Sequence, residues 1–411
     1  MKQAPQIKRY ISPVVESLAL IHHKMAFISG PRQVGKTTCA RSIGESSGNE
    51  TQYRNWDDKN FRREWTKDPS GVIQNSDRPL LVIFDEIHKA KLWKRDLKGL
   101  YDLHGDQTKI IVTGSARLNI FKKGGDSLLG RYIPFRLHPF SLGELTNRKA
   151  TPNPQETWDL IFNGKSQSAK HRSTYEDLLL FGGFPSPYSR RSEQYLNIWH
   201  QERVEKLIRE DLRDLSRIPD LSRLEMLAAL LPERVGNLLS LSGLREDLEV
   251  AHNTVKNWMQ YLEQLFYIYY VRPYSKGLKR SLKKEPKLFL WDWSEVANEG
   301  ARFENMVASA MLKSCDFWTD TGWGVHQLHF LRDKQKREVD FLLTQKGRPF
   351  LSIEAKLSTE ALKLHFIPFC KMLGVTKHIQ IIHSPGIWKR KKIDGIDVIQ
   401  ASADLILQHF V

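Results

Sequence analysis

The 411-residue sequence contains only three cysteines, and it has no apolar run long enough to cross a membrane. Cys39, Cys315 and Cys370 stand far apart and form no Cys-x-x-Cys pair. This spacing argues against a disulfide framework and against a zinc site, and it fits a reducing cytoplasm. Apolar stretches such as residues 265–271 are far shorter than the roughly 20 residues that a bilayer requires. Charged side chains also interrupt any signal-peptide core near the start. We therefore expect a cytoplasmic protein that does not insert into membranes.

Acidic residues are too few to balance the basic ones. The chain has 63 Lys and Arg against 47 Asp and Glu, a formal net charge of +16 and a pI of about 9.6. A surplus of this size indicates a polyanionic partner, most simply nucleic acid, although a basic protein without such a partner is the alternative. A hydrophobic content of 40% is typical of a globular chain, and the length predicts two or three domains.

The pattern of apolar segments divides the chain into four parts. Residues 1–148 alternate short apolar strands with helical stretches, which predicts an α/β domain with a parallel sheet. Residues 149–172 are polar and read as a linker or insertion. Residues 173–297 have helical periodicity, and three helices followed by two apparent strands resemble a winged helix. A new unit with a helix and further strands occupies residues 298–411.

A glycine-rich turn follows the first apolar strand. Residues 30–37 match the pattern GxxxxGK[ST], in which backbone N–H groups point at phosphate oxygens. The lysine supplies charge to the β- and γ-phosphates, and the threonine hydroxyl binds Mg²⁺. The sequence therefore predicts an ATP site formed by Gly30, Pro31, Arg32, Gln33, Val34, Gly35, Lys36, Thr37 and Thr38.

An acidic pair follows the second apolar strand. Asp85 is predicted to hold the Mg²⁺ shell, and Glu86 to polarise the water that attacks the γ-phosphate, although a helix-capping pair is the alternative. Thr113 and Ser115 end the next strand, where they can sense the γ-phosphate or position the water. Arg131 is a candidate arginine finger, in cis or from a neighbouring subunit, and a plain surface arginine is the competing interpretation.

Five segments together resemble a large family of uncharacterised bacterial and archaeal AAA+-type ATPases. They are residues 29–38, 84–89, 113–115, 127–131 and 182–185. The resemblance implies an additional-strand P-loop fold with Glu86 as the hydrolytic glutamate. It also implies a helical, winged-helix-like segment and a restriction-endonuclease-like C-terminal domain. No sensor-two arginine is recognisable, so the resemblance does not extend to ring assembly, and a homo-oligomer stays an open alternative.

The C-terminal part offers the acids of a PD-(D/E)XK nuclease. Such enzymes place one acid on a strand and Glu-x-Lys on the next, often with a further glutamate from the preceding helix. The acids bind Mg²⁺, and the lysine lowers the pKa of the attacking water. Here the candidates are Asp340, then Glu354 and Lys356, with Glu304 upstream. Glu304, Asp340 and Glu354 are the predicted metal ligands.

The strand pattern makes this hypothesis specific. Alternation puts Glu354 and Lys356 on one face of their strand, and a hairpin that pairs Gln345 with Pro349 would set Asp340 directly opposite Glu354. A one-residue slip would separate the two acids. A second Glu-x-Lys, at residues 285–287, has no acidic strand before it, and we expect it to lie in a basic loop.

Basic side chains in the middle segment are candidate nucleic-acid contacts. A helix over residues 253–266 would present Lys256 on its outward face toward a major groove. A basic wing over residues 275–287 would contact phosphates. A solvated loop and a spacer or oligomer surface are the alternatives. The candidate contacts are Lys256, Lys276, Lys279, Arg280, Lys283 and Lys284, with Lys287 at the end of the wing.

These patterns predict an ATP- and Mg²⁺-dependent hydrolase coupled to a nuclease-like domain that acts on DNA. A different interpretation is an ATP-gated switch that binds DNA or a protein without cutting it. A third is a conventional AAA+ remodeller, which would require stable hexamers.

Overall fold

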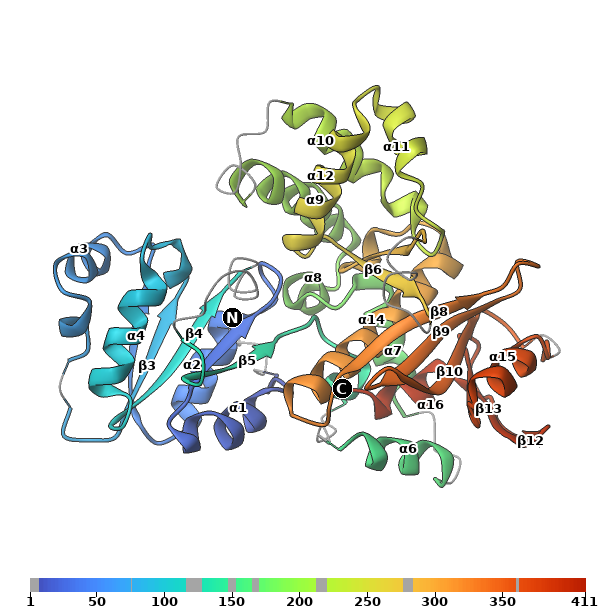
Figure 1. Cartoon of the computed structure of the whole chain (residues 1–411), viewed down its shortest axis with the longest axis horizontal. Coiled ribbons are helices and arrows are strands. Elements are labelled where there is room, and N and C mark those ends of the chain that lie inside the picture. Colours follow the sequence, from blue (N-terminus) through green and yellow to red (C-terminus); the bar gives the residue numbers. More distant parts are fainter. Residues whose placement is uncertain are drawn as a thin grey trace. The chain divides into compact units, whose positions relative to one another are not determined.

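The computed structural model describes residues 7–74, 76–115, 128–146, 153–164, 170–211, 220–275, 284–359 and 362–411. The chain forms two compact units, Met1–His138 and Pro139–Val411 (Figure 1). The first unit ends before the expected boundary at residue 148, and the second unites segments that were expected as separate domains. Among the described residues, no helix has the length and apolarity needed to cross a bilayer.

The first unit is built on a parallel five-stranded sheet. Its order is β2-β3-β4-β1-β5, and all four neighbouring pairs run parallel. Strand β4 lies between β1 and β3, so the expected additional-strand arrangement is confirmed. Strands β1 and β3 are buried along their whole length, because helices cover both faces of such a sheet. The strands are β1 (Met25–Ser29), β2 (Glu50–Asn55), β3 (Leu80–Asp85), β4 (Thr108–Gly114) and β5 (Tyr132–Arg136).

Within the described residues of this unit, four α-helices accompany the sheet. In α3, Phe61 and Trp65 stand one turn apart and pack against Phe84 of β3, with ring centroids 6.2 and 5.6 Å away. Asp58 caps this helix by accepting a hydrogen bond from the backbone of Asn60. The helices are α1 (Ser12–Leu18), α2 (Lys36–Ser46), α3 (Lys59–Lys67) and α4 (Trp93–His104), with 3-10 turns at η1 (Leu20–His22), η2 (Pro69–Val72) and η3 (Ile87–Lys89).

The second unit begins with helices. They are α5 (Leu142–Leu145), α6 (Pro154–Phe162), α7 (Arg172–Phe181), α8 (Pro185–Arg190), α9 (Glu193–Lys206), the π-helical turn η5 (Leu207–Asp211), α10 (Leu221–Leu230), η6 (Pro232–Arg234), α11 (Leu241–Leu248) and α12 (His252–Gln264). Gly182 ends α7 at φ +75°, and a Cβ there would lie 2.5 Å from a carboxylate oxygen of Asp292. A Cβ on Gly183 would lie 2.7 Å from the carbonyl of Phe140. This close backbone approach explains why two glycines stand before α8.

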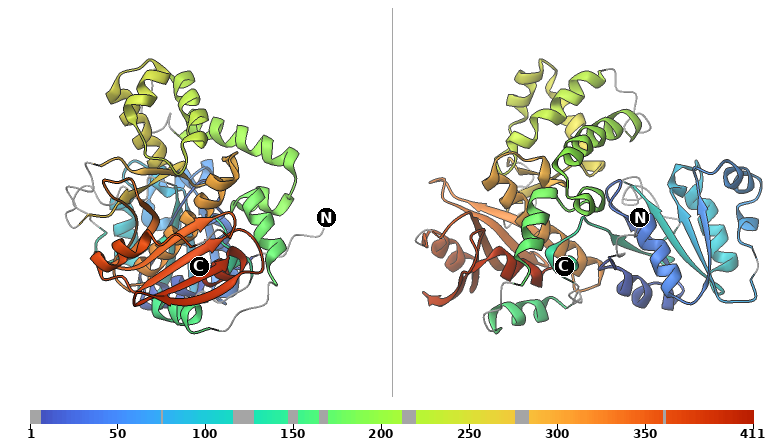
Figure 2. Two further views of the ribbon diagram at one scale, coloured as in Figure 1. Left: turned by 90° about the vertical axis from the view of Figure 1, so that its right-hand side faces the viewer. Right: turned by 180° about the vertical axis from the view of Figure 1, so that it is seen from behind.

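An eight-stranded mixed sheet forms the rest of this unit, and its order is β12-β13-β11-β10-β9-β8-β6-β7. Figure 2 shows the C-terminal strands of this sheet, coloured orange to red, from two further sides. The strands are β6 (Ile268–Pro273), β7 (Lys287–Leu290), β8 (His326–Arg332), β9 (Glu338–Gln345), β10 (Arg348–Lys356), β11 (Lys377–Ile382), β12 (Trp388–Ile393) and β13 (Ile396–Ser402). The accompanying helices are η7 (Trp293–Glu295), α14 (Glu299–Asp320), α15 (Phe366–Leu373), α16 (Ala403–Ile406) and η8 (Leu407–His409).

The hairpin expected as the wing of a winged helix belongs to this sheet. Strands β6 and β7 pair antiparallel, and β6 also pairs in parallel with β8 through Arg272 and His329. The hairpin therefore continues the sheet that carries the C-terminal acids. Strands from both sides of the expected boundary at residue 297 therefore share one sheet.

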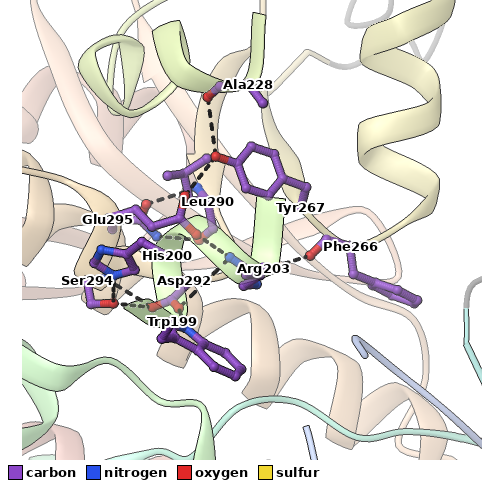
Figure 3. A network of polar contacts seen from close by, with 11 residues as sticks. Trp199, His200, Arg203, Ala228, Phe266, Tyr267, Leu290, Asp292, Ser294 and Glu295 are labelled. Carbon is purple, nitrogen blue, oxygen red and sulfur yellow. Dashed lines mark hydrogen bonds and ion pairs between the residues drawn. The ribbon is translucent and has the colours of Figure 1, made fainter. Parts of the chain in front are cut away.

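A buried polar network ties α9 to the segment around η7 (Figure 3). Arg203, 7% exposed, forms an ion pair with Glu295. The hydroxyl of Tyr267 donates to the same carboxylate at 2.7 Å, and Trp199 donates to Asp292 at 2.8 Å. Burial raises the pKa of Glu295, and Arg203 opposes that shift. Such groups are tolerated in a core because each has a partner.

Candidate active sites

The glycine-rich turn lies between β1 and α2. A side chain at Gly30 would place its Cβ 2.3 Å from the carbonyl oxygen of Leu137, the residue after β5. The turn can therefore lie this close to Leu137 only if residue 30 is glycine. Gly35 has φ +95°, in the left-handed region that favours glycine. The Lys36 Nζ is buried and donates to the carbonyls of Gly30 and Pro31 at 3.0 and 2.7 Å. The lysine is therefore held inside the turn that the sequence predicts for phosphates.

Two further residues of the glycine-rich turn, Gln33 and Val34, have defined positions in the structure, and Arg9 from outside the turn bonds to Val34. Gln33 has φ +63°, and Val34 is fully buried. The guanidinium of Arg9 donates to the carbonyl of Val34 at 2.6 Å and also to that of His138. Arg9 was missed in the sequence because it lies 25 positions before its partner in the turn. Arg32 lies in the same turn, before α2 begins.

Asp85 collects three hydroxyl groups at the end of β3. Thr37 donates to its carboxylate at 2.8 Å, and Tyr53 of β2 donates to the same oxygen at 2.6 Å. Thr113 of β4 donates to the other oxygen. The Thr37 hydroxyl and the Asp85 carboxylate are hard oxygen donors side by side, which suits Mg²⁺. Burial, followed by the bond to Asp85, raises the pKa of Tyr53 to about 12.

Glu86 occupies a strained backbone position beside this group. It has φ +57° and ψ +19°, a left-handed conformation that a non-glycine residue adopts at some cost. Its backbone N–H donates to the carbonyl of Thr113 at 3.0 Å. Burial raises the pKa of its carboxyl, and the charge of Lys36 opposes the shift. His88 links two predicted residues, since its Nε2 lies 3.6 Å from Glu86 and 3.5 Å from the Ser115 hydroxyl.

Arg131 does not join the other nucleotide-site residues. Its carbonyl accepts a hydrogen bond from Met25, the first residue of β1, whereas the glycine-rich turn follows the last residue. The two ends of this strand are about 13 Å apart. The Arg131 guanidinium makes a double hydrogen bond with Asp102 at 2.7 and 3.1 Å. This position gives no support to a finger in cis, and both the cis role and the role from a neighbouring subunit stay predictions.

The pairing of β9 with β10, the two strands that carry Asp340 and Glu354, differs from the predicted pairing at the turn. Gln345 pairs with Arg348 rather than Pro349, so the turn is one residue tighter than expected. A bulge between Pro349 and Leu351 then shifts the register by one. Beyond the bulge, the pairs continue as Leu351 with Leu343, Ser352 with Leu342 and Ile353 with Phe341.

This pairing ends at Ile353 and Phe341, and one more step in the same register would set Glu354 opposite Asp340. The backbone N–H of Ala355 donates to the Asp340 carboxylate at 2.9 Å, and the Lys356 Nζ lies 3.3 Å from the same oxygen. Glu354 is fully buried, with His365 Nε2 2.7 Å from its carboxylate. Burial and the charge of Asp340 raise the pKa of Glu354, while Lys356 opposes the shift.

Lys287 lies in this acidic group, although it was assigned to an exposed basic wing. It is 3% exposed, and its Nζ lies 2.9 Å from Glu304 and 2.5 Å from Glu338. Burial alone would lower the pKa of Lys287, but the charges of Glu304, Asp340 and Glu338 outweigh burial and raise it. Burial raises the pKa of Glu304 to about 7, against the pull of Lys287. The assignment failed because Lys287 begins β7, whose burial depends on distant strands.

The three predicted C-terminal acids thus each have a lysine or histidine partner and do not form an open cage. Within the described part of the chain, no set of three or more His, Cys, Asp or Glu side chains is arranged to hold a metal ion. Asp340 is paired with Lys356, Glu304 with Lys287 and Glu354 with His365.

The other predicted nucleic-acid contacts are only partly described. Lys256 lies on α12 with an exposed side chain, as predicted, and Lys284 is also exposed. The buried side of α12 is formed by Val255, Trp258, Met259 and Leu262. Lys276, Lys279, Arg280 and Lys283 lie outside the residues that the structure describes.

A comparison with protein-family models finds a match for most of the first unit. Residues 22–146 match a family model described as an AAA domain. The chain therefore carries an AAA-type P-loop ATPase domain. Residues 172–297 and 299–402 match two further models, each described as a domain of unknown function (DUF8612 and DUF4143).

Comparisons with individual proteins add relatives without an assigned function. An uncharacterized protein of Haemophilus influenzae is 23% identical over 93% of this chain and 94% of its own length. An uncharacterized protein of Mycobacterium tuberculosis is 23% identical over 81% of this chain and 70% of its own length. The Thermotoga maritima RuvB Holliday junction branch migration motor is 16% identical, with a TM-score of 0.33, over 68% of this chain and 96% of that one. The Aeropyrum pernix ORC1 protein, solved in complex with DNA, is 15% identical, with a TM-score of 0.28, over 73% and 91%.

Proposed function

We propose that the protein hydrolyses ATP with Mg²⁺ in its AAA domain and that its C-terminal sheet carries a Mg²⁺-dependent nuclease-like site for DNA. The observation that carries the first half is the convergence of Lys36, Thr37 and Asp85 on one glycine-rich turn. The second half rests on Asp340 of β9 and on Glu354 and Lys356 of the neighbouring strand β10, where the Lys356 Nζ lies 3.3 Å from the Asp340 carboxylate.

The ATPase half assigns a role to each side chain. Lys36 now bonds two backbone carbonyls, and it would exchange these bonds for oxygens of the β- and γ-phosphates. Thr37 and Asp85 would hold Mg²⁺, which neutralises charge on the phosphates. Glu86 would accept a proton from the attacking water, and the rise in its pKa caused by burial makes its carboxylate a stronger base.

The nuclease-like half has a comparable division of roles. Asp340 and Glu354 would hold Mg²⁺ through hard carboxylate oxygens, with Glu304 as a further ligand from α14. The metal would supply a water of lowered pKa and stabilise charge on the phosphate. Lys356 lies 3.3 Å from Asp340, where it can orient that water. Lys287 holds Glu304 at 2.9 Å in the paired arrangement.

The ATPase assignment is tested by phosphate release. Lys36→Ala is expected to lose ATP binding, whereas Glu86→Gln is expected to bind ATP and turn it over 100- to 10,000-fold more slowly, as roughly expected for loss of a general base. Lys91→Ala, an exposed lysine after η3, is the matched control and should retain the wild-type rate. An Lys36→Ala protein as active as wild type would refute the assignment.

The nuclease-like assignment is tested with supercoiled and linear DNA in Mg²⁺, with and without ATP. Asp340→Ala is expected to abolish cleavage. Asp394→Ala, which removes an exposed partner of Lys371, is the control for a lost acid on the same sheet. If Asp340→Ala and wild type cut at the same rate, or if neither cuts, the cleavage proposal is rejected.

A second function is an ATP-gated switch that binds DNA or a protein without cutting it. It is favoured by the lysine partners of Asp340 and Glu304, which neutralise these two acids in place of a metal. The switch hypothesis predicts that Glu86→Gln binds DNA with different affinities in ATP and in ADP and that no strand breaks appear.

Light scattering with each nucleotide tests whether the protein forms a homo-oligomer. A homo-oligomer is required if Arg131 acts on the nucleotide site of a neighbouring subunit.

A further inference from the structure

One face of helix α3, in the first unit, carries a stripe of positive charge. Residues at helical spacings of three and four share a face, and here they are Lys59, Arg62, Arg63, Thr66 and Lys67. These five side chains line a hollow of about 530 Å³ in the surface, and no acid among the described residues lines it. Three of the four cations are exposed, and Arg62 is half-buried. Such a concentration of one sign of charge attracts anions.

The acids near this helix are engaged elsewhere. Asp58 and Asp68 cap α3 and η2 by accepting hydrogen bonds from backbone N–H groups. Asp57 forms an ion pair with Lys89 at 2.8 Å, and Glu64 of α3 does not line the hollow. Within the described part of the chain, no ion pair joins an acid to any of the four cations of the stripe. Their charge is therefore available to a partner outside the chain.

The stripe is unfavourable for the helix that carries it. Lys59 and Arg63 stand four residues apart, as do Arg63 and Lys67, and like charges at this spacing repel each other and weaken a helix. The packing of α3 does not depend on them, because Phe61 and Trp65 on the opposite side supply its contacts with β3. An exposed cationic face that weakens its own helix indicates a role in binding.

The dimensions of the stripe and the buried side of the helix select the occupant. From Lys59 to Lys67 the helix rises about 12 Å, which corresponds to roughly three or four phosphates of one strand along a duplex. A lipid surface is a poor match, because an amphipathic helix binds lipid by inserting its apolar side chains, and Phe61 and Trp65 are buried in the unit. The two arginines suit phosphate oxygens, to which a guanidinium can donate two parallel hydrogen bonds.

We propose that the basic face of α3 binds the phosphate backbone of a nucleic acid, so that the AAA domain has a nucleic-acid contact of its own. This surface is separate in the sequence from the candidate contacts at residues 256–284 and from the C-terminal acids. The inference shares with the proposed function only the class of partner, and it requires neither ATP hydrolysis nor cleavage.

A positive net charge also attracts polyanions without any defined contact. That general attraction depends on the total charge and not on where each cation lies. The two explanations therefore differ in whether a pair of cations on the stripe matters more than an equal pair elsewhere on the same unit.

The experiment compares full-length wild type with two double variants. Arg63→Ala/Lys67→Ala removes two cations of the stripe, and the matched control Arg78→Ala/Lys91→Ala removes two exposed cations of the same unit outside it. Binding to short fluorescent duplexes of DNA and of RNA is measured in EDTA, without ATP, over a range of NaCl concentrations.

The stripe variant is expected to bind roughly 10- to 30-fold more weakly at about 0.15 M NaCl, with a slope of log K against log salt smaller by about 2, because two phosphate contacts are lost. The control is expected to keep the wild-type slope. Thermal unfolding verifies the fold, and the stripe variant should unfold at a temperature no lower than wild type, since repulsion within α3 is relieved. A loss with both duplexes assigns the surface to the phosphates that DNA and RNA share, and a loss with one assigns it to that nucleic acid.

Three results would overturn the inference: equal slopes for the two double variants, no measurable binding by wild type, or displacement of the duplex by polyglutamate as effective as by unlabelled duplex. The last would assign the stripe to an acidic protein. A protein without ATPase or cleavage activity would reject the proposed function and leave this inference standing, since binding is measured without ATP and without metal.

Discussion

Replacing Lys287 by methionine tests how the acidic group is held together. The substitution keeps the length of the side chain and removes the cation between Glu304 and Glu338. Removing one member of a buried ion pair costs about 3–5 kcal/mol when its partner is fully buried. Glu304 and Glu338 keep about a fifth of their side-chain surface exposed, so we expect a loss of about 2–3 kcal/mol. For a unit of this size the Tm should fall by roughly 5–10 °C.

The loss of stability in Lys287→Met should also depend on pH. Burial already raises the pKa of Glu304 to about 7, and loss of Lys287 raises it further. A carboxyl whose pKa is higher in the folded state than in the unfolded state lowers stability as the pH rises above its unfolded value. The stability gap between Lys287→Met and wild type should therefore be larger at pH 8 than at pH 6. Adding Glu304→Gln to the variant should restore part of the loss at pH 8.

Scanning calorimetry of the full-length protein measures these shifts. Lys284→Met is the matched control, because Lys284 lies three residues earlier in the same segment and is exposed. It should change the Tm by less than about 1 °C. Equal Tm values for the two variants, or a gap that shrinks from pH 6 to pH 8, would refute the argument that Lys287 neutralises a buried acid.

Three further predictions concern other parts of the molecule. Gly30→Ala should lose more than tenfold in affinity for a fluorescent ATP analogue, whereas Gly99→Ala, in the open middle of α4, should bind normally and gain about 0.5–1 kcal/mol in urea unfolding. The ATPase rate at saturating ATP should fall as the pH drops through the raised pKa of Glu86, because a protonated carboxyl cannot act as a base; a pH-independent wild-type rate would contradict this. Lys313→Met should cost about 3–5 kcal/mol by leaving Glu144 buried without its cation, 2.7 Å away, and adding Glu144→Leu should recover most of it; no recovery would count against the pair.

The nucleotide site was largely predictable because its parts are local. The glycine-rich turn, its lysine and its threonine are contiguous in the sequence, and the apolar run of β3 ends directly at Asp85. The order of the sheet then follows from the P-loop resemblance, which the inserted β4 confirms. Tyr53 was not found, because its hydrogen bond to Asp85 depends on which strand becomes the neighbour of β3.

The register of the C-terminal hairpin shows how far a periodic pattern can be trusted. Alternation correctly put Glu354 and Lys356 on one face, but it did not predict that Gln345 would pair with Arg348. The bulge beside Pro349 restored the register, since proline lacks the N–H group that regular pairing uses. Beyond the bulge the strands have the offset that pairing of Gln345 with Pro349 would have given, but the tighter turn and the bulge were both unpredicted.

By itself the sequence determined the features that neighbouring residues create: the phosphate-binding turn, the apolar strands, the helical faces and the basic balance of the chain. Only the tertiary structure decided which distant charges meet. It placed Lys287 among acids instead of in an exposed wing, and it paired Arg131 with Asp102 at the far end of β1. The physical reason is that short-range periodicity fixes the face of a side chain, whereas its electrostatic partner depends on strand order and register across the whole sheet.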